Sequence, residues 1–145
     1  MYHAVKDNKF TGVSYDKLSD NIFAHHSQYG EYLCKPKRVV AEGDDVTAED
    51  KIDALWQYAN WYIQEVCEFD AMGMSAVIGH RVMAEVSMLP HTRADEVIAW
   101  NQGIWADYEQ RRAIMLAEGG EPDLDYSAHG IRPWRVAEVL AEGGE

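Results

Sequence analysis

Apolar side chains recur at helical spacing along the middle of the chain, most regularly between residues 48 and 69. A repeat of about 3.6 residues places such side chains on one side of an α-helix, opposite the polar positions. The repeat consists of Ile52, Leu55, Trp56, Ala59, Ile63 and Val66. Thr47 and Asp50 precede it in the arrangement of a capping box, in which each side chain accepts the other residue's backbone N–H. The pattern therefore predicts an amphipathic helix over residues 48–69.

Two further long helices are predicted downstream. Residues 71–88 are apolar on nearly every side and include four methionines, so this helix is expected at the centre of a core or of an interface. The next helix covers residues 93–117, with a Thr-x-x-Asp cap in front of it and Gly119 as its stop. A short last helix is expected over residues 133–142, because proline suits the first position of a helix.

The N-terminal part of the chain follows a different pattern. Residues 1–15 are rich in β-forming side chains and predict a hairpin that turns at residues 6–9. Residues 20–33 show apolar positions at helical spacing and predict a helix, although Gly30 weakens it. Residues 38–41 are short and apolar and predict a third strand.

These elements together predict a mainly α protein, a small helical bundle with a β-hairpin at its N-terminal end. A chain of 145 residues has the size of one domain, so we expect a single domain over residues 1–145. Within it, residues 1–45 are expected to form a subregion that packs on a helical core of residues 46–145.

The sequence also predicts where the protein works. The N-terminal residues lack a basic segment followed by an apolar run, so no signal peptide is expected. The most apolar stretch contains His80, Arg81 and Glu85, which argues against a membrane span. Cys34 and Cys67 are too few for a disulfide framework. We therefore expect a cytoplasmic protein with reduced thiols.

Charge is distributed unevenly along the chain. Residues 1–38 carry six basic and four acidic side chains, a net charge of +2, whereas the remaining residues carry seven basic and twenty-one acidic ones, a net charge of −14. A field of this sign repels nucleic acid and attracts basic protein surfaces. The short basic segment Lys35–Arg38 does not outweigh it. We therefore predict a protein partner and no direct contact with nucleic acid.

Acidic and aromatic side chains form the candidate partner-binding set. The acidic residues fall in two runs at predicted helix ends and make one negative strip if both ends lie on the same side. Three aromatic residues are predicted at the flanks of the helix cores, where tyrosine and tryptophan often contact a partner. The set comprises Asp44, Asp45, Glu49, Asp50, Asp53, Tyr58, Trp61, Trp100, Glu118, Glu121, Asp123 and Asp125.

No motif in the chain commits it to a chemistry. The sequence lacks a phosphate-binding glycine loop, a His-Glu-x-x-His pair, a Cys-x-x-Cys pair and a Gly-x-Ser-x-Gly elbow. Glu65 and Glu68 form only half of the carboxylate pairs that a helical pyrophosphatase needs for magnesium. Cys34 has cations beside it in sequence and is the more reactive thiol candidate, although an inert thiol is expected. We predict no cofactor and no metal site.

Three hypotheses for the function remain. The first is a non-enzymatic acidic protein-binding module, an inhibitor that occupies the basic nucleic-acid-binding surface of a partner enzyme. In size and acidity the chain resembles, as a class, the small virus-encoded inhibitors of host defence enzymes. The second is a homo-oligomeric assembly protein, indicated by the methionine-rich helix and the surplus tryptophans. The third is a small helical metal-dependent enzyme that uses His80, Glu85, His91 or Asp95.

Overall fold

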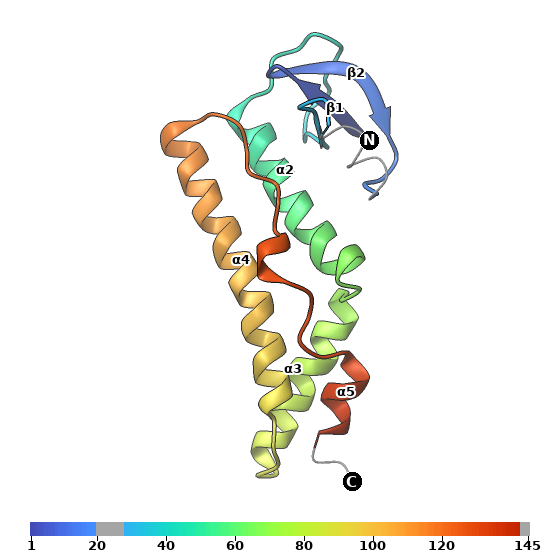
Figure 1. Ribbon diagram of the computed structural model, residues 1–145, viewed down its shortest axis with the longest axis vertical. Helices are drawn as coiled ribbons and strands as arrows, with labels where there is room; N and C mark the ends of the chain where they lie inside the picture. The colour runs from blue at the N-terminus through green and yellow to red at the C-terminus, as the bar shows by residue number, and fades with distance from the viewer. Residues whose placement is uncertain (20–27, 143–145) are drawn as a thin grey trace. The chain divides into compact units, whose positions relative to one another are not determined.

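The computed structural model describes residues 1–19 and 28–142. Three long helices dominate these residues, and a small antiparallel sheet lies near the N-terminus (Figure 1). This confirms the predicted mainly α fold. The elements, in chain order, are β1 (Tyr2–Lys6), β2 (Lys9–Tyr15), β3 (Tyr32–Cys34), α2 (Ala48–Trp61), η1 (Tyr62–Val66), α3 (Ala71–Val86), α4 (Thr92–Glu118), η2 (Ser127–His129) and α5 (Val136–Ala141).

The three strands are ordered β2-β1-β3, and both pairings are antiparallel. The predicted hairpin is confirmed, because Val5 lies opposite Phe10 in the pairing of β1 with β2. Asp7 and Asn8 form its turn with φ angles of 51° and 64°. Two successive left-handed residues match the right-handed twist of the flanking strands, and aspartate and asparagine accept this conformation more readily than most residues.

Two N-terminal predictions differ from the structure. The helix predicted over residues 20–33 is wrong at its end, because residues 32–34 form β3 and pair with β1; residues 20–27 lie outside the described residues. Gly30, with φ of 71°, turns the chain just before β3. The strand predicted over residues 38–41 is also wrong. This segment is a loop in which Val39 is 98% exposed, because β3 already occupies the edge of β1.

The chain divides into two compact units, and α2 and α4 each contribute residues to both. Unit 1 contains Met1–Tyr58 and Tyr108–Leu124, and unit 2 contains Ala59–Asp107 and Asp125–Glu145. The core of unit 1 joins the sheet to α2 through Val5, Phe10, Tyr32, Cys34, Val46 and Ala54. The buried side chains of unit 2 include Ile63, Cys67, Phe69, Val77, Ala84, Val97, Ile104, Tyr126 and Val139. The single domain over residues 1–145 stays a prediction.

The helix predicted over residues 48–69 begins where expected and ends earlier. Its α-helical part stops at Trp61, and a wider π-helical turn, η1, continues to Val66. The buried side is also rotated from the predicted stripe, since Tyr58 is 1% exposed and Trp56 is 48% exposed. Burial of Tyr58 is possible because its hydroxyl oxygen accepts a hydrogen bond from the Leu33 backbone N–H at 2.9 Å.

The later helices follow the prediction closely. α4 ends at Glu118, and the next residue, Gly119, has a φ of 70° and donates its N–H to the Met115 carbonyl at 2.9 Å. α5 is shorter than expected because its regular turns begin only at Val136, after Pro133. Among the helices of the described ranges, none has the length and hydropathy of a membrane span.

Candidate functional site: the outer face of α3

Helix α3 turns a narrow side inward in unit 2. The Asp70 carboxylate caps its start and accepts a hydrogen bond from the Gly73 N–H at 2.8 Å. Along the helix, Val77 and Ala84 are buried seven residues apart, a spacing that keeps them on one side. Gly73 belongs to the same side, because a Cβ there would meet a Val136 methyl of α5 at 3.1 Å. The inward side is therefore built mostly from small residues.

The opposite side of α3 is apolar and exposed. Met72, Val82, Met83 and Val86 share it because successive residues of an α-helix are rotated by about 100°. We call this surface the α3 face, and it comprises Met72, Ile78, Val82, Met83 and Val86, continued past the helix end by Met88 and Leu89. Ser75 and Gly79 are exposed between these side chains.

The α3 face is large for the surface of a single chain. Its seven apolar residues are 48 to 93% exposed. Side chains of this size and exposure present on the order of 800 Å² of apolar surface, whereas a monomer typically exposes a few hundred Å² in one patch. The sequence predicted this helix at the centre of a core or of an interface, and the structure buries only its narrow inward side.

Charged side chains lie at the edge of the α3 face and pair with one another. Arg81 forms ion pairs with Glu85 and, at 3.0 Å, with Asp95, whose other carboxylate oxygen lies 2.8 Å from Nδ1 of His91. Burial would raise the pKa of Asp95, but the hydrogen bonds from Arg81 and His91 outweigh it and hold that pKa below its usual value. The α3 face itself contains no charged residue.

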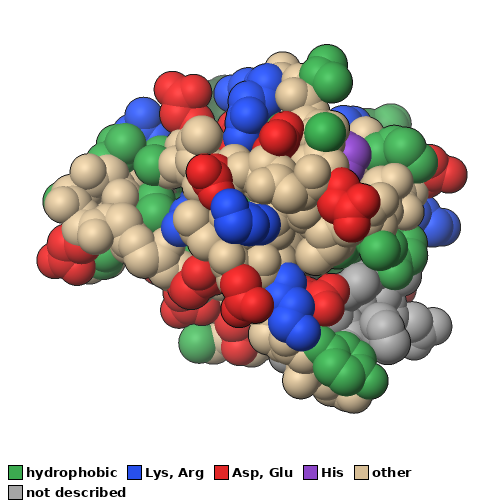
Figure 2. Space-filling model, turned by 90° about the horizontal axis from the view of Figure 1, so that it is seen from above, with side chains coloured by type: hydrophobic (Ala, Val, Ile, Leu, Met, Phe, Trp, Pro, Cys, Tyr) green, Lys and Arg blue, Asp and Glu red, His purple; other side chains and the backbone are tan. Residues whose placement is uncertain are grey.

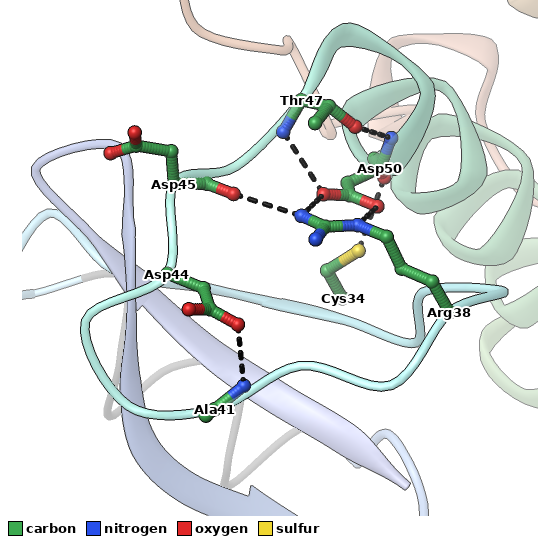
Figure 3. Close-up of polar contacts among 7 residues, drawn as sticks. All are labelled: Cys34, Arg38, Ala41, Asp44, Asp45, Thr47 and Asp50. Carbon is green, nitrogen blue, oxygen red and sulfur yellow. Dashed lines mark hydrogen bonds and ion pairs between the residues drawn. The ribbon is translucent and has the colours of Figure 1, made fainter.

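The first predicted acidic run is largely occupied by internal contacts in unit 1 (Figure 3). Asp50 is 2% exposed and forms the predicted capping box, accepting from the Thr47 N–H at 2.9 Å while Thr47 Oγ1 accepts the Asp50 N–H at 3.2 Å. Arg38 donates to both Asp50 carboxylate oxygens, at 2.7 and 3.3 Å. Asp50 was expected to bind a partner, but it lies inside the fold and fixes the loop before α2.

Three other members of that run also have internal contacts. Asp45 lies 2.5 Å from the Lys9 ammonium, and Asp53 lies 3.4 Å from that of Lys37. The Asp44 carboxylate accepts the Ala41 N–H at 2.8 Å. A carboxylate paired in this way is partly neutralised, so the first run contributes less negative field than its sequence suggests.

The two acidic runs meet in unit 1. Lys51 of α2 donates to the Gly120 carbonyl at 2.7 Å, which brings the second run beside the start of α2. We call the exposed carboxylates there the acidic surface, and they are Glu49, Glu118, Glu121 and Asp123. Asp125 belongs to unit 2, where its carboxylate accepts the Ser127 N–H at 2.8 Å.

Basic side chains interrupt this negative charge. Figure 2 shows Asp and Glu side chains interspersed with Lys and Arg on the face seen from above. A hollow of about 1150 Å³ in unit 1 has the same mixed lining, with Glu49, Asp50 and Asp53 beside Lys37, Arg38 and Arg112. Trp56, Tyr108 and Leu116 contribute the larger apolar side chains of its wall. A lining of both signs does not select a ligand of one charge.

The three aromatic candidates lie in different environments. Tyr58 was expected on a contact surface and lies in the core of unit 1 instead, because the Leu33 N–H satisfies its hydroxyl group. Trp61 and Trp100 are half-buried in unit 2. Trp100 donates from Nε1 to the Gly130 carbonyl at 3.0 Å and packs edge-on against Phe69. Both contacts give Trp100 a structural role.

Three residues of the enzyme hypothesis belong to one chain of contacts, because Arg81 pairs with both Glu85 and Asp95, and Asp95 contacts His91. The buried Nε2 of His80 has no hydrogen-bond partner among the described residues. Within the same residues, no group of three or more His, Cys, Asp and Glu side chains is placed to hold a metal ion.

One acid–base pair was not predicted from the sequence. Nε2 of His129 lies 2.6 Å from the Asp107 carboxylate in unit 2, although the two residues are 22 positions apart and no local pattern links them. The nearby Cys67 is buried, its thiol points to the Gly130 carbonyl at 3.9 Å, and burial raises its pKa. Burial also raises the pKa of Cys34. Neither thiol has the lowered pKa of a nucleophile.

No protein-family model, curated protein or solved structure matches this chain, so its function is inferred from its own residues.

Proposed function

We propose that this protein is a non-enzymatic protein-binding module that contacts its partner through the α3 face. The observation that carries the proposal is the exposure of five apolar side chains on one side of a capped, well-formed helix, continued by two more just past its end. Leaving this surface in water costs free energy, and a partner that covers it recovers that free energy on association. Methionine is enriched at such contact surfaces because its flexible side chain adapts to the partner.

Site-specific photocrosslinking tests the proposal. A photoreactive phenylalanine analogue replaces Met83 on the α3 face or, as the matched control, the exposed Gln110 of α4. In cells that naturally contain the protein, we expect covalent protein adducts from position 83 and few or none from position 110. The absence of any adduct from position 83 would contradict the proposal.

A second candidate function rests on the acidic surface. The hydrogen bond from Lys51 to the Gly120 carbonyl gathers Glu49, Glu118 and Glu121 at one end of unit 1. We propose for this surface a basic partner, the nucleic-acid-binding groove of an enzyme that the protein would inhibit. The net charge of −12 supports attraction to such a groove, because opposite charge speeds encounter and favours the complex.

The salt dependence of binding to a Lys- and Arg-rich peptide tests this second function. Changing Glu49, Glu118 and Glu121 to glutamine should weaken binding several-fold, and added salt should weaken binding of the unmodified protein. The control variant changes Asp16→Asn, Glu65→Gln and Glu68→Gln, which removes the same amount of charge elsewhere. Equal losses in both variants would show that only net charge matters and would contradict a specific acidic site.

A further inference from the structure

We propose that the partner of the α3 face is a second copy of this chain, bound as an antiparallel α3–α3 pair with Gly79 at its centre. This inference rests on the proposed function and names its partner. A pair related by two-fold symmetry uses the same surface on both chains, so that surface has to be complementary to itself.

The area of the α3 face suits such a pair. Each copy offers on the order of 800 Å² of apolar surface, which equals the area that each partner buries in a protein–protein interface of standard size. The large exposed side chains of the face are all apolar, and homodimer interfaces are more apolar than an average non-obligate interface. A second copy would cover the helical part of the face without a further protein.

The shape of the α3 face is complementary to itself. Gly79 lies midway along α3, is exposed, and a Cβ built on it would meet no atom within 4 Å, so two helices can approach closely there. In an antiparallel pair centred on Gly79, Met83 of one chain lies opposite Ser75 of the other, and Met72 lies opposite Val86. Met72 and Met83 then each face a smaller residue, which lets the two surfaces interdigitate.

The charge of the protein opposes the pair at long range and permits it at contact. Two chains of net charge −12 repel each other in solution. The α3 face carries no charge, and Arg81 is already paired with Glu85 and Asp95, so the contact buries no unpaired ion. Added salt should therefore strengthen self-association by screening the repulsion, whereas it should weaken binding at the acidic surface. The same net charge disfavours an anionic membrane as the occupant.

Sedimentation equilibrium of the full chain tests the inference. The unmodified protein is expected to shift from the 16.5 kDa chain mass to twice that value as its concentration rises, at lower concentrations when salt is added. The variant Val82→Glu/Met83→Glu places four carboxylates in the pair and should weaken self-association by at least tenfold. The control Val39→Glu/Ile114→Glu adds the same charge at exposed positions off the α3 face and should associate nearly as the unmodified protein does.

Two further measurements separate the possible failures. Gly79→Leu raises helix propensity and fills the proposed crossing, so it should weaken association several-fold without loss of thermal stability. Fluorescence of the uncharged dye Nile red reports exposed apolar surface. If the protein is a monomer whose dye binding is lost in Val82→Glu/Met83→Glu, the pair is overturned and the α3 face has another partner. Flotation of the monomer with phosphatidylcholine vesicles would lead to the same conclusion. A monomer whose dye binding is unchanged in Val82→Glu/Met83→Glu overturns both the pair and the proposed function.

Discussion

Replacing Asp50 by alanine is expected to lower the free energy of unfolding by about 2 to 4 kcal/mol. The change removes half of the capping box at the start of α2. It also removes the acceptor of two hydrogen bonds from Arg38, which fix the loop that joins β3 to α2. Denaturant unfolding followed by circular dichroism measures the loss.

The effect of Asp50 is expected to depend on pH. Burial alone would raise the pKa of this carboxyl, but the hydrogen bonds from Arg38 and Thr47 outweigh burial and hold the pKa below the usual 3.8. The folded state therefore gains stability from the ionised carboxylate above about pH 4 and loses it as the pH falls through the lowered pKa. In Asp50→Asn this part of the acid dependence should disappear. An unchanged pH profile would show that Arg38 does not stabilise the carboxylate.

A charged residue should destabilise the fold strongly on the inward side of α3 and only slightly on the outer side. Val77→Asp buries a carboxylate among apolar side chains and is expected to unfold unit 2 or to cost several kcal/mol. Val82→Asp lies half-exposed on the α3 face and should change the free energy of unfolding of the single chain by about 1 kcal/mol or less. Both variants are compared by thermal unfolding at low protein concentration, because association would add to apparent stability. An equal loss of thermal stability in the two variants would mean that Val82 is covered by other parts of the same chain.

Local signals predicted most of the fold. The capping box of Thr47 and Asp50, the turn at Asp7 and Asn8, and the stop at Gly119 depend on neighbouring residues, and the structure contains all three. The signal for β3 is not local. Residues 32–34 form a strand because β1 offers them backbone partners, and nothing in their own spacing distinguishes them from the end of a helix.

The candidate site could be predicted only in part. The apolar run of residues 71–88 has almost no polar side, so its periodicity could not tell which side faces the core. Tyr58 was expected at the surface because its position falls on the flank of the predicted apolar stripe. The buried side is rotated toward it, and the Leu33 backbone N–H satisfies its hydroxyl group. Asp50 is buried because Arg38 lies against it, a contact between residues twelve positions apart.

Methionine oxidation by hydrogen peroxide, followed by mass spectrometry as the protein is diluted, tests most directly whether the α3 face is a contact between chains. We predict that Met72 and Met83 are protected in concentrated solution and become reactive on dilution, while the buried Met115 stays protected throughout. Rapid oxidation of Met83 at every concentration would contradict a pair of chains. Protection of Met83 in a sample that sedimentation shows to be monomeric would contradict the exposed α3 face itself.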